Sequence, residues 1–351
     1  MIAVDEKRTG FDRDGLLPAG PLSELVLALL ASFPSTARTD SGEPADAVAQ
    51  LVGEVADPLA DDDLQLALYL CYELHYRSFP GVDLDWEWDP GLLAARAVLE
   101  RAFLAALEEE VPAEVAIDHE RVGERLFELE EADQGVSLSR HLEHQASLAQ
   151  FREFVVHRSA YQLKEADPHS WAIPRLTGAA KTALLEVQGD EYGGGRAQRM
   201  HSALFAKTMR ALELADRENA YLSLLPGSTL ATVNLMSAFG LRRARRGAIV
   251  GHLAMFEMTS ARPNRRYGNG LRRLGFDEEA TDFYDEHVEA DAVHENIAAY
   301  DLAGGLARAE PELAPDVLFG ARSLLHLEDR FGRAVLAAWE EGRSSLRAPL
   351  P

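Results

Sequence analysis

The sequence has a single cysteine, Cys71, among its 351 residues. One cysteine cannot form an internal disulfide framework, a cysteine-based zinc site or an iron–sulfur cluster within one chain. Long apolar runs are also missing, and the longest stretch, residues 25–33, is far shorter than a membrane span. The first fifteen residues hold no apolar run, so we expect no signal peptide and a soluble, cytoplasmic protein.

Positive charge is scarce in this chain. Lys and Arg number 35 against 58 Asp and Glu, which gives a formal net charge of -23 at pH 7. Such a chain repels phosphate backbones and anionic lipid, so we expect it to bind neither nucleic acid nor a membrane surface. Its hydrophobic fraction of 47% is ordinary for a globular protein and is enough for one large domain or two smaller ones.

Alternating β-branched runs are almost absent, and helical spacing of apolar residues dominates. We therefore predict an all-α fold with helices near residues 21–33, 45–57, 62–78, 90–110, 119–132, 136–166, 176–190, 197–215, 228–260 with a break, 262–274, 277–300 and 310–341. Residues 1–130 are acidic and interrupted by prolines, whereas nine of the eleven histidines lie between residues 136 and 345. The sequence thus predicts an N-terminal helical extension over 1–130 and a helical bundle over 131–351 that carries any chemistry.

One helix of the predicted bundle carries three potential metal ligands. His287, Asp291 and His294 stand at positions i, i+4 and i+7, which places them on one helical stripe about 60° wide. Imidazole with carboxylate suits iron, manganese or zinc rather than calcium or magnesium. The alternative is a solvated acidic helix with two incidental histidines. Residues 274–307 hold ten acids and no Lys or Arg, so the helix should repel itself and be the least stable part of the core without metal.

Two other places could supply partners to this stripe. Glu191 and His201 flank the glycines at 193–195, and Glu257 lies in a strongly apolar helix. A buried carboxylate is costly unless it is paired or binds a metal. The alternative for Glu257 is a partly exposed residue or a partner for a nearby arginine. A ferritin-type di-iron bundle is disfavoured, because no histidine here has a glutamate three positions before it, and His-Glu-x-x-His is absent.

Taken in order, these elements resemble the haem-oxygenase-like di-iron oxidases, the iron-containing redox enzyme family. The resemblance covers about residues 136–300 and is carried by Asp190-Glu191-Tyr192-Gly193-Gly194-Gly195 with Met200-His201, by Glu257, and by His287-x3-Asp291-x2-His294. It implies a haem-oxygenase-like helical bundle whose metal ligands are Glu191, His201, Glu257, His287, Asp291 and His294. Some members use an extra carboxylate from the preceding helix, and Glu165 lies in a matching place, with a helix-terminal surface residue as the alternative. The gap between Glu191 and His201 is longer than in some members.

The resemblance also implies an activity. It is that of a non-haem di-iron oxidase or oxygenase with two Fe(II) per chain, dioxygen as co-substrate and an external reductant, for which a reductase or ferredoxin is a candidate partner. The reaction would be N-oxygenation, hydroxylation, desaturation or C–C cleavage of a small molecule, often in natural-product biosynthesis. It implies no catalytic residue beyond the metal ligands, and a homodimer is a candidate assembly. The alternative is a haem-oxygenase-like binding module without oxidase activity.

Overall fold

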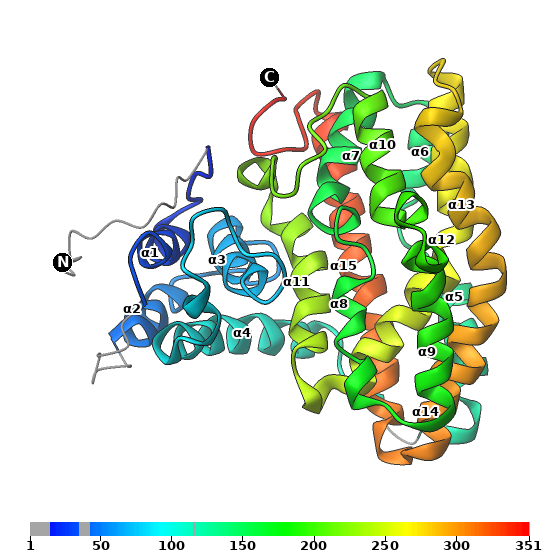
Figure 1. Cartoon of the computed structure of the whole chain (residues 1–351), viewed down its shortest axis with the longest axis horizontal. Coiled ribbons are helices and arrows are strands. Elements are labelled where there is room, and N and C mark those ends of the chain that lie inside the picture. The colour runs from blue at the N-terminus through cyan, green and yellow to red at the C-terminus, as the bar shows by residue number, and fades with distance from the viewer. Residues whose placement is uncertain (1–14, 35–42, 115–116, 351) are drawn as a thin grey trace. The chain divides into compact units, whose positions relative to one another are not determined.

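The computed structural model describes residues 15–34, 43–114 and 117–350, apart from the side chains of residues 290–293. Every regular element in these ranges is a helix, so the all-α prediction is confirmed (Figure 1). No helix among the described residues is long and apolar enough to cross a bilayer.

The chain divides by its internal contacts into two compact units. Unit 1 comprises Met1–Glu110 with Leu222–Asn234, and unit 2 comprises Val111–Tyr221 with Leu235–Pro351. Unit 1 contains α1 (Pro21–Leu30), α2 (Glu43–Val52), α3 (Asp62–Glu73), α4 (Pro90–Glu110) and the start of α11 (Gly227–Gly240). The boundary at residue 130 stays a prediction from the sequence.

Unit 2 contains the end of α11 and all of the remaining helices. These are α5 (Val122–Ala132), α6 (Leu138–His144), α7 (Leu148–Gln162), α8 (Asp167–Ser170), α9 (Gly178–Glu191), α10 (His201–Ala211), α12 (Arg246–Arg273), α13 (Glu278–Asn296), α14 (Gly304–Ala309) and α15 (Ala314–Glu340), joined in places by short 3-10 turns. Unit 2 is therefore the helical bundle that holds every histidine proposed as a ligand.

The acidic run at the start of α3 caps two helices of unit 1. The Asp61 carboxylate accepts the first free N–H groups of α3, as a helix N-cap does. Asp63 reaches back to α1, where it accepts the Ser23 N–H at 2.7 Å. The Asn234 side chain of α11 donates to the backbone and side-chain oxygens of Gln65 at 2.9 and 2.7 Å. These acids thus stabilise helix ends rather than form a binding patch.

Helix α12 is the central helix of unit 2 and packs along both α13 and α15. Its crossing with α15 depends on two glycines. A Cβ atom at Gly251 would lie 1.8 Å from the Val317 carbonyl oxygen, and one at Gly320 would lie 2.0 Å from the Ala248 carbonyl oxygen. Because both obstacles are backbone atoms, no side-chain rotation could make room for either Cβ. The two helices therefore approach backbone to backbone at this point.

Several predicted helix boundaries are wrong, among them the ends predicted at residues 57 and 78, where α2 and α3 end at Val52 and Glu73. Two of the errors have a clear physical reason. The predicted helix over 136–166 is two helices, because Ser147 starts α7 as an N-cap in a reciprocal capping box with Gln150. The predicted break between 260 and 262 does not exist, since α12 runs through Pro263 without interruption. Helix α12 packs against α5, α6, α13 and α15, and this packing offsets the backbone hydrogen bond that Pro263 removes.

The helix that carries His287 and His294 changes type after the second histidine. Residues Ile297–Ala303 form a π-helical segment between α13 and α14, and the backbone stays helical across both junctions. The segment packs on α5, α9 and α12. Gly123 of α5 permits one of these contacts, because a Cβ there would lie 2.5 Å from the Tyr300 ring. π-helical turns of this kind occur often at functional sites.

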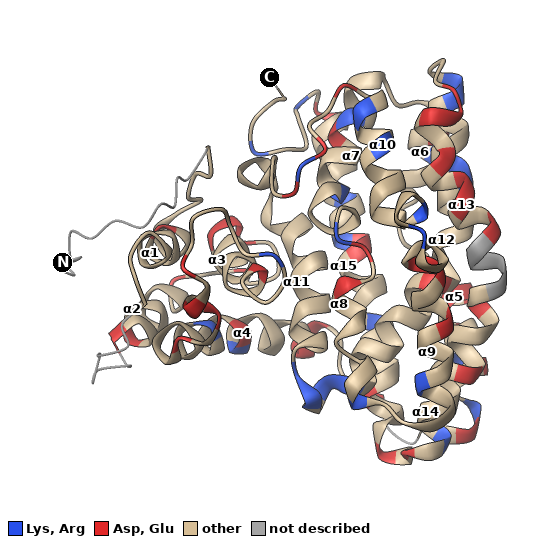
Figure 2. Cartoon of the chain, in the orientation of Figure 1, with Lys and Arg blue, Asp and Glu red and all other residues tan. Residues whose placement is uncertain are grey.

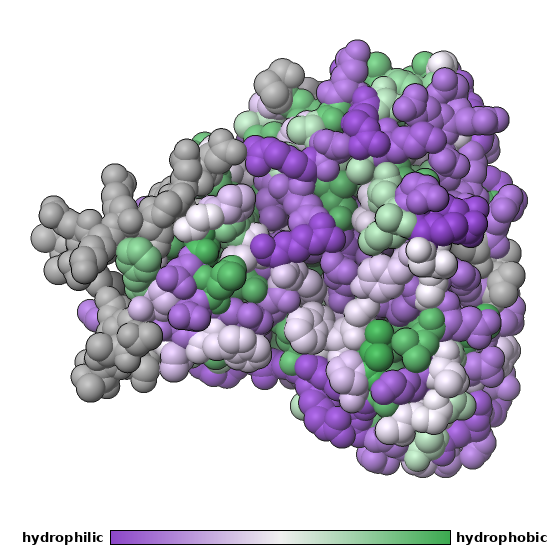
Figure 3. Space-filling model, in the orientation of Figure 1, coloured by the Kyte–Doolittle hydropathy of each residue, from purple (hydrophilic) through white to green (hydrophobic). Residues whose placement is uncertain are grey.

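The acids of α13 find their counter-charges on neighbouring elements. Asp277 caps the helix by accepting the Glu279 N–H at 3.1 Å, and acids at this end are favoured by the helix dipole. Further along, ion pairs join Lys207 to Asp282 and Arg272 to Asp285. Acidic residues recur along the α13 ribbon in Figure 2, and polar residues cover much of the face of unit 2 seen in Figure 3. Basic side chains on neighbouring helices therefore offset part of the repulsion between the acids of α13 that the sequence predicts.

Candidate metal centre

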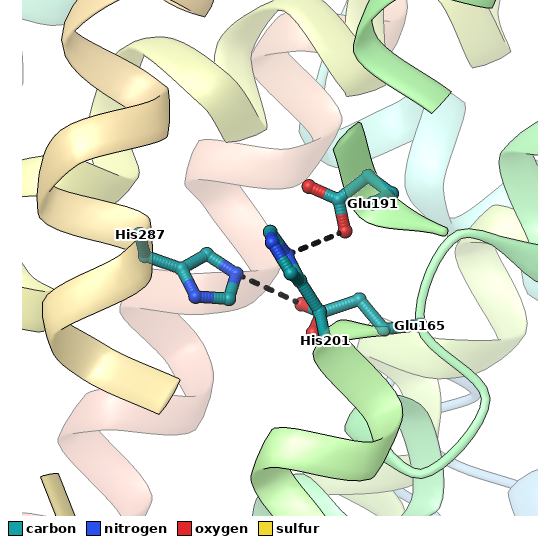
Figure 4. Close-up of side chains that lie close together, drawn as sticks. All are labelled: Glu165, Glu191, His201 and His287. Carbon is teal, nitrogen blue, oxygen red and sulfur yellow. Dashed lines mark ion pairs between the residues drawn. The ribbon is translucent and has the colours of Figure 1, made fainter. Parts of the chain in front are cut away.

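Two overlapping groups of buried carboxylates and imidazoles lie inside unit 2. The first joins Glu165, Glu191, His201 and His287, and the second joins Glu191, Glu257 and His294. Within each group the donor atoms all lie within 4.8 Å of one another, and every member is buried. Figure 4 shows the side chains of the first group converging from separate elements. Glu191 belongs to both groups, so one carboxylate stands between two sets of donors.

The donors come from helix ends as well as helix interiors. Glu165 follows α7 just before α8, Glu191 is the last residue of α9, and His201 is the first residue of α10. Glu257 lies within α12, and His287 and His294 lie on α13. The site therefore depends on the packing of several helices, and no short sequence segment could form it alone.

The turn between Glu191 and His201 is built on glycine. Gly193 has φ 69°, in the left-handed region, and a Cβ on it would lie 2.6 Å from the backbone of Arg199 and Met200. The chain can therefore double back directly after α9. As a result, Nδ1 of His201 lies 3.0 Å from Oε2 of Glu191. The glycines at 193–195 thus serve to bring the end of α9 against the start of α10.

His287 is oriented by the backbone of its own helix. Its Nδ1 lies 2.7 Å from the carbonyl oxygen of Phe283, one turn earlier. A carbonyl oxygen only accepts, so Nδ1 carries the proton and donates it, and in the neutral ring the lone pair is then on Nε2. Nε2 lies 3.6 Å from Oε1 of Glu165, and the His201 ring is 4.2 Å away between centroids. The imidazole therefore presents its basic nitrogen to the other donors.

His294 lies between two carboxylates. Its Nδ1 lies 3.2 Å from Oε2 of Glu257, and its Nε2 lies 3.0 Å from Oδ2 of Asp190. Burial alone would lower the pKa of His294, but the hydrogen bonds to Glu257 and Asp190 outweigh burial and raise the pKa to about 9. Without a metal this ring is thus a cation at neutral pH, and a metal ion would have to displace its proton.

The donor set fits an iron site. Oε2 of Glu165 is buried and makes no hydrogen bond within the described part of the chain, which is costly for a carboxylate without a further partner. Burial raises the pKa of both Glu165 and Glu257. Three buried carboxylates with three imidazoles give a mixed oxygen and nitrogen set suited to iron, manganese or zinc. A bound cation would satisfy the free oxygen and neutralise the clustered acids.

The structure brings together five of the six residues that the sequence marks as ligands. These are Glu191, His201, Glu257, His287 and His294, and Glu165 joins them. Asp291 lies in α13, but its side chain is outside the described residues, so its position in the site stays a prediction. The role of all these residues as iron ligands is likewise a prediction.

A cavity of about 930 Å³ lies in unit 2, and its lining includes no described donor but does include residues close to the donors in the chain. Tyr161 and Phe256 belong to its wall, and their rings meet edge to face at 5.6 Å. Phe256 directly precedes Glu257 in α12. The pKa of Tyr161 is raised by burial and then by the negative charges of Glu165, Glu191 and Glu257, so its ring borders the site. The volume is in the range of small-molecule pockets.

Sequence reasoning missed two features near the site. The first is Asp190, which stands in the sequence motif beside Glu191 but was given no role. The second is a buried pair in which Nε2 of His169 lies 3.1 Å from Nδ1 of His252. Burial lowers the pKa of both rings, so they are neutral at physiological pH. Asp190 and His294 are 104 residues apart in the sequence, and His169 and His252 are 83 residues apart. Helical spacing cannot predict a contact between residues so far apart in the chain.

Comparison with known proteins identifies a family and a relative of this chain. A family model described as "Iron-containing redox enzyme" matches residues 152–329, just over half of the chain. Nitrosourea synthase from Streptomyces achromogenes subsp. streptozoticus is 26% identical over 189 residues, which cover 53% of this chain and 40% of that protein. The chain thus spans well under two thirds of the length of this relative. Because the matched range holds every described donor and the fold is all-α, the chain belongs to the iron-containing redox enzyme family and has its haem-oxygenase-like fold.

Proposed function

We propose that this protein is a non-haem di-iron oxidase that uses dioxygen to oxidise a nitrogen or carbon centre of a small molecule. The observation that carries the proposal is Glu191, a buried carboxylate shared by two donor groups. A carboxylate has two oxygens and can therefore contact two cations at once. The other donors divide into one set of Glu165, His201 and His287 and a second set of Glu257, His294 and, by its spacing, Asp291.

Two ferrous ions in these sets would supply the electrons that reduce dioxygen, with an external reductant such as a reductase or ferredoxin to restore them. The chain encloses the donor groups in its interior, away from water. Glu165, His201 and His294 have 1–3% of their surface exposed, so bulk water is excluded. The raised pKa of Tyr161 keeps the proton on its phenol oxygen at neutral pH. Tyr161 is therefore a hydrogen-bond donor at the border between the site and the cavity.

The substrate would approach through the cavity behind Tyr161 and Phe256. The wall of this cavity carries both apolar and charged side chains, among them Phe331, Arg158 and Glu328, so a polar small molecule could be held there. The name of the relative states that it makes a nitrosourea. Oxidation of a nitrogen is therefore included among the reactions that we propose for this chain.

Iron stoichiometry tests the proposal. The metal-free protein is loaded with ferrous ion under anaerobic conditions, freed of excess ion, and analysed for iron and for dioxygen consumption on exposure to air. We expect about two irons per chain in the wild type and about one in His287→Ala and in His294→Ala, because each variant weakens one set. Glu191→Ala removes the shared donor and should leave less than one iron per chain and no rapid dioxygen consumption.

His326→Ala is the matched control, because His326 lies on α15 outside both donor groups. It should load iron and consume dioxygen as the wild type does. Circular dichroism of each metal-free variant checks that the helices are intact. A folded wild type that retains no iron would overturn the proposal, and so would Glu191→Ala with the full iron content of the wild type.

A further inference from the structure

Asp190 is the outer partner of a buried imidazole. Oδ2 of Asp190 lies 3.0 Å from Nε2 of His294, while Nδ1 of the same ring lies 3.2 Å from Oε2 of Glu257. The two carboxylates differ in surroundings, since the Glu257 side chain is 4% exposed and the Asp190 side chain is 62% exposed. His294 therefore connects the interior of the second donor group to an acid at the surface.

The chemistry of imidazole gives this contact a direction. A neutral ring has one N–H and one lone pair, and an ionised carboxylate can only accept a hydrogen bond. Without a metal both nitrogens of His294 carry protons, and each faces a carboxylate. A metal ion in the Glu191–Glu257–His294 group would displace the proton of Nδ1, the nitrogen that faces Glu257, and leave the N–H at Nε2 with Asp190. A carboxylate that accepts from the far nitrogen of a metal-binding imidazole fixes the orientation of the ring and makes the near nitrogen more basic.

The other histidine of the same helix is arranged differently. His287 donates from Nδ1 to the neutral carbonyl of Phe283 and presents Nε2 to its donors. His294 presents Nδ1 and is backed by a charged acceptor. Two imidazoles seven residues apart thus offer opposite nitrogens, and only the second has a carboxylate as its outer partner.

Helix stability does not explain the position of Asp190. It is the penultimate residue of α9, where the negative end of the helix dipole disfavours an acid. Its side chain is largely exposed and pairs with His294 of α13 rather than with a residue of its own helix. Asp190 is thus unfavourable for the stability of α9 but forms a contact with the buried imidazole of His294. This combination favours a role for Asp190 in the metal centre.

We propose that Asp190 is a positioning residue for the Glu191–Glu257–His294 group, holding the N–H of His294 at Nε2 so that Nδ1 binds the metal ion. This inference rests on the proposed function, because it takes that group to be a metal site. Asp190 does not contact the metal or the substrate, and it acts only through His294. Its removal should therefore weaken one of the two sites and leave the other unchanged.

The test compares Asp190→Ala, Asp190→Asn and the control Glu186→Ala, a loss of another exposed acid from the same helix. Zinc is the probe, because it is diamagnetic and its binding is not complicated by dioxygen. Titration should show two zinc ions per chain in the wild type and the control. Asp190→Ala should weaken one of the two sites about 10–100-fold. Asp190→Asn should recover part of that loss, because its amide oxygen still accepts a hydrogen bond.

Nitrogen-15 NMR of the zinc-loaded protein gives an independent readout. In the wild type the Nε2–H of His294 should be observed and protected from exchange, with Nδ1 bound to zinc. In Asp190→Ala this proton should exchange faster. Two outcomes would overturn the inference: zinc affinity and the Nε2–H signal unchanged in Asp190→Ala, or a fall in the Tm of the metal-free protein that accounts for the whole loss, which would indicate a structural role. A wild type that binds no zinc at Glu257 and His294 would instead overturn the proposed function.

Discussion

Replacing Gly251 by alanine should destabilise unit 2 and disturb the metal centre. The added Cβ would lie 1.8 Å from the Val317 carbonyl oxygen, 2.6 Å from its carbonyl carbon and 3.0 Å from its Cα. All three are backbone atoms, so α12 and α15 would have to separate by about 1 Å or more to restore van der Waals contact. Separation would loosen the packing of fully buried neighbours such as Leu253 and Val317.

The size of the effect follows from two opposing terms. Overpacking a tight core costs about 1–3 kcal/mol and occasionally more, and here the rigid backbone leaves no cheaper relaxation. Alanine gains about 1 kcal/mol over glycine in a helix interior. We expect a net loss of about 2 kcal/mol, which for a unit of this size lowers Tm by roughly 4–8 °C. Glu257 lies six residues further along α12, so iron affinity should fall as well.

Thermal and urea unfolding followed by circular dichroism would measure this loss. Gly189→Ala is the control, because Gly189 lies in α9 and no atom lies within 4 Å of its added Cβ. It should stabilise the protein by about 0.5–1 kcal/mol. Gly320→Ala meets the Ala248 carbonyl oxygen at 2.0 Å and should resemble Gly251→Ala. The double variant should lose less than the sum of the two, because the first methyl has already parted the helices. A Gly251→Ala protein as stable as the wild type would refute this reasoning.

Two further predictions concern acid stability and the ligand whose side chain is not described. Burial, and then the charge of Arg158, lowers the pKa of His157 from 6.5 to about 3, so below pH 6.5 the unfolded chain binds a proton that the folded chain does not. Stability should therefore fall as pH decreases from 6.5 towards 3, by up to about 4 kcal/mol, and His157→Gln should flatten this dependence in urea unfolding at a series of pH values. Asp291→Ala should lower iron content from about two to about one per chain while keeping the helical circular dichroism spectrum, and an unchanged iron content would place Asp291 outside the donor set.

The fold class could be predicted because helical spacing is a local property. Apolar residues recur at helical intervals along most of the chain, whereas the errors at Ser147 and Pro263 have different causes, one local and one in the packing. The start of α7 was available as a capping signal, Ser147 followed three residues later by Gln150, which the longer apolar pattern obscured. Pro263 is a strong breaking signal on its own, and only the helices packed around α12 show why it is tolerated.

The candidate site was predictable for a different reason. His287 and His294 share a helical stripe that spacing alone reveals. Glu191, His201 and Glu257 were candidate partners from their positions, and the resemblance to a family joined them to the stripe as one ligand set. Contacts between helices that are far apart in the sequence were indicated neither by spacing nor by the resemblance. The pairing of Asp190 with His294 depends on how α9 packs near α13, and no pattern within either segment encodes that packing.

The π-helical segment Ile297–Ala303 makes this helix sensitive to changes in chain length. A π-helical turn takes up about one residue more than an α-helical turn, which offsets the angular phase of all later residues by roughly 100°. The face that presents His287 and His294 is therefore out of phase with the face that α14 presents to its neighbours. A deletion of one residue within the segment would restore a regular α-helix and rotate α14 against the histidines. An insertion or deletion in the loop before α13 would leave that phase unchanged.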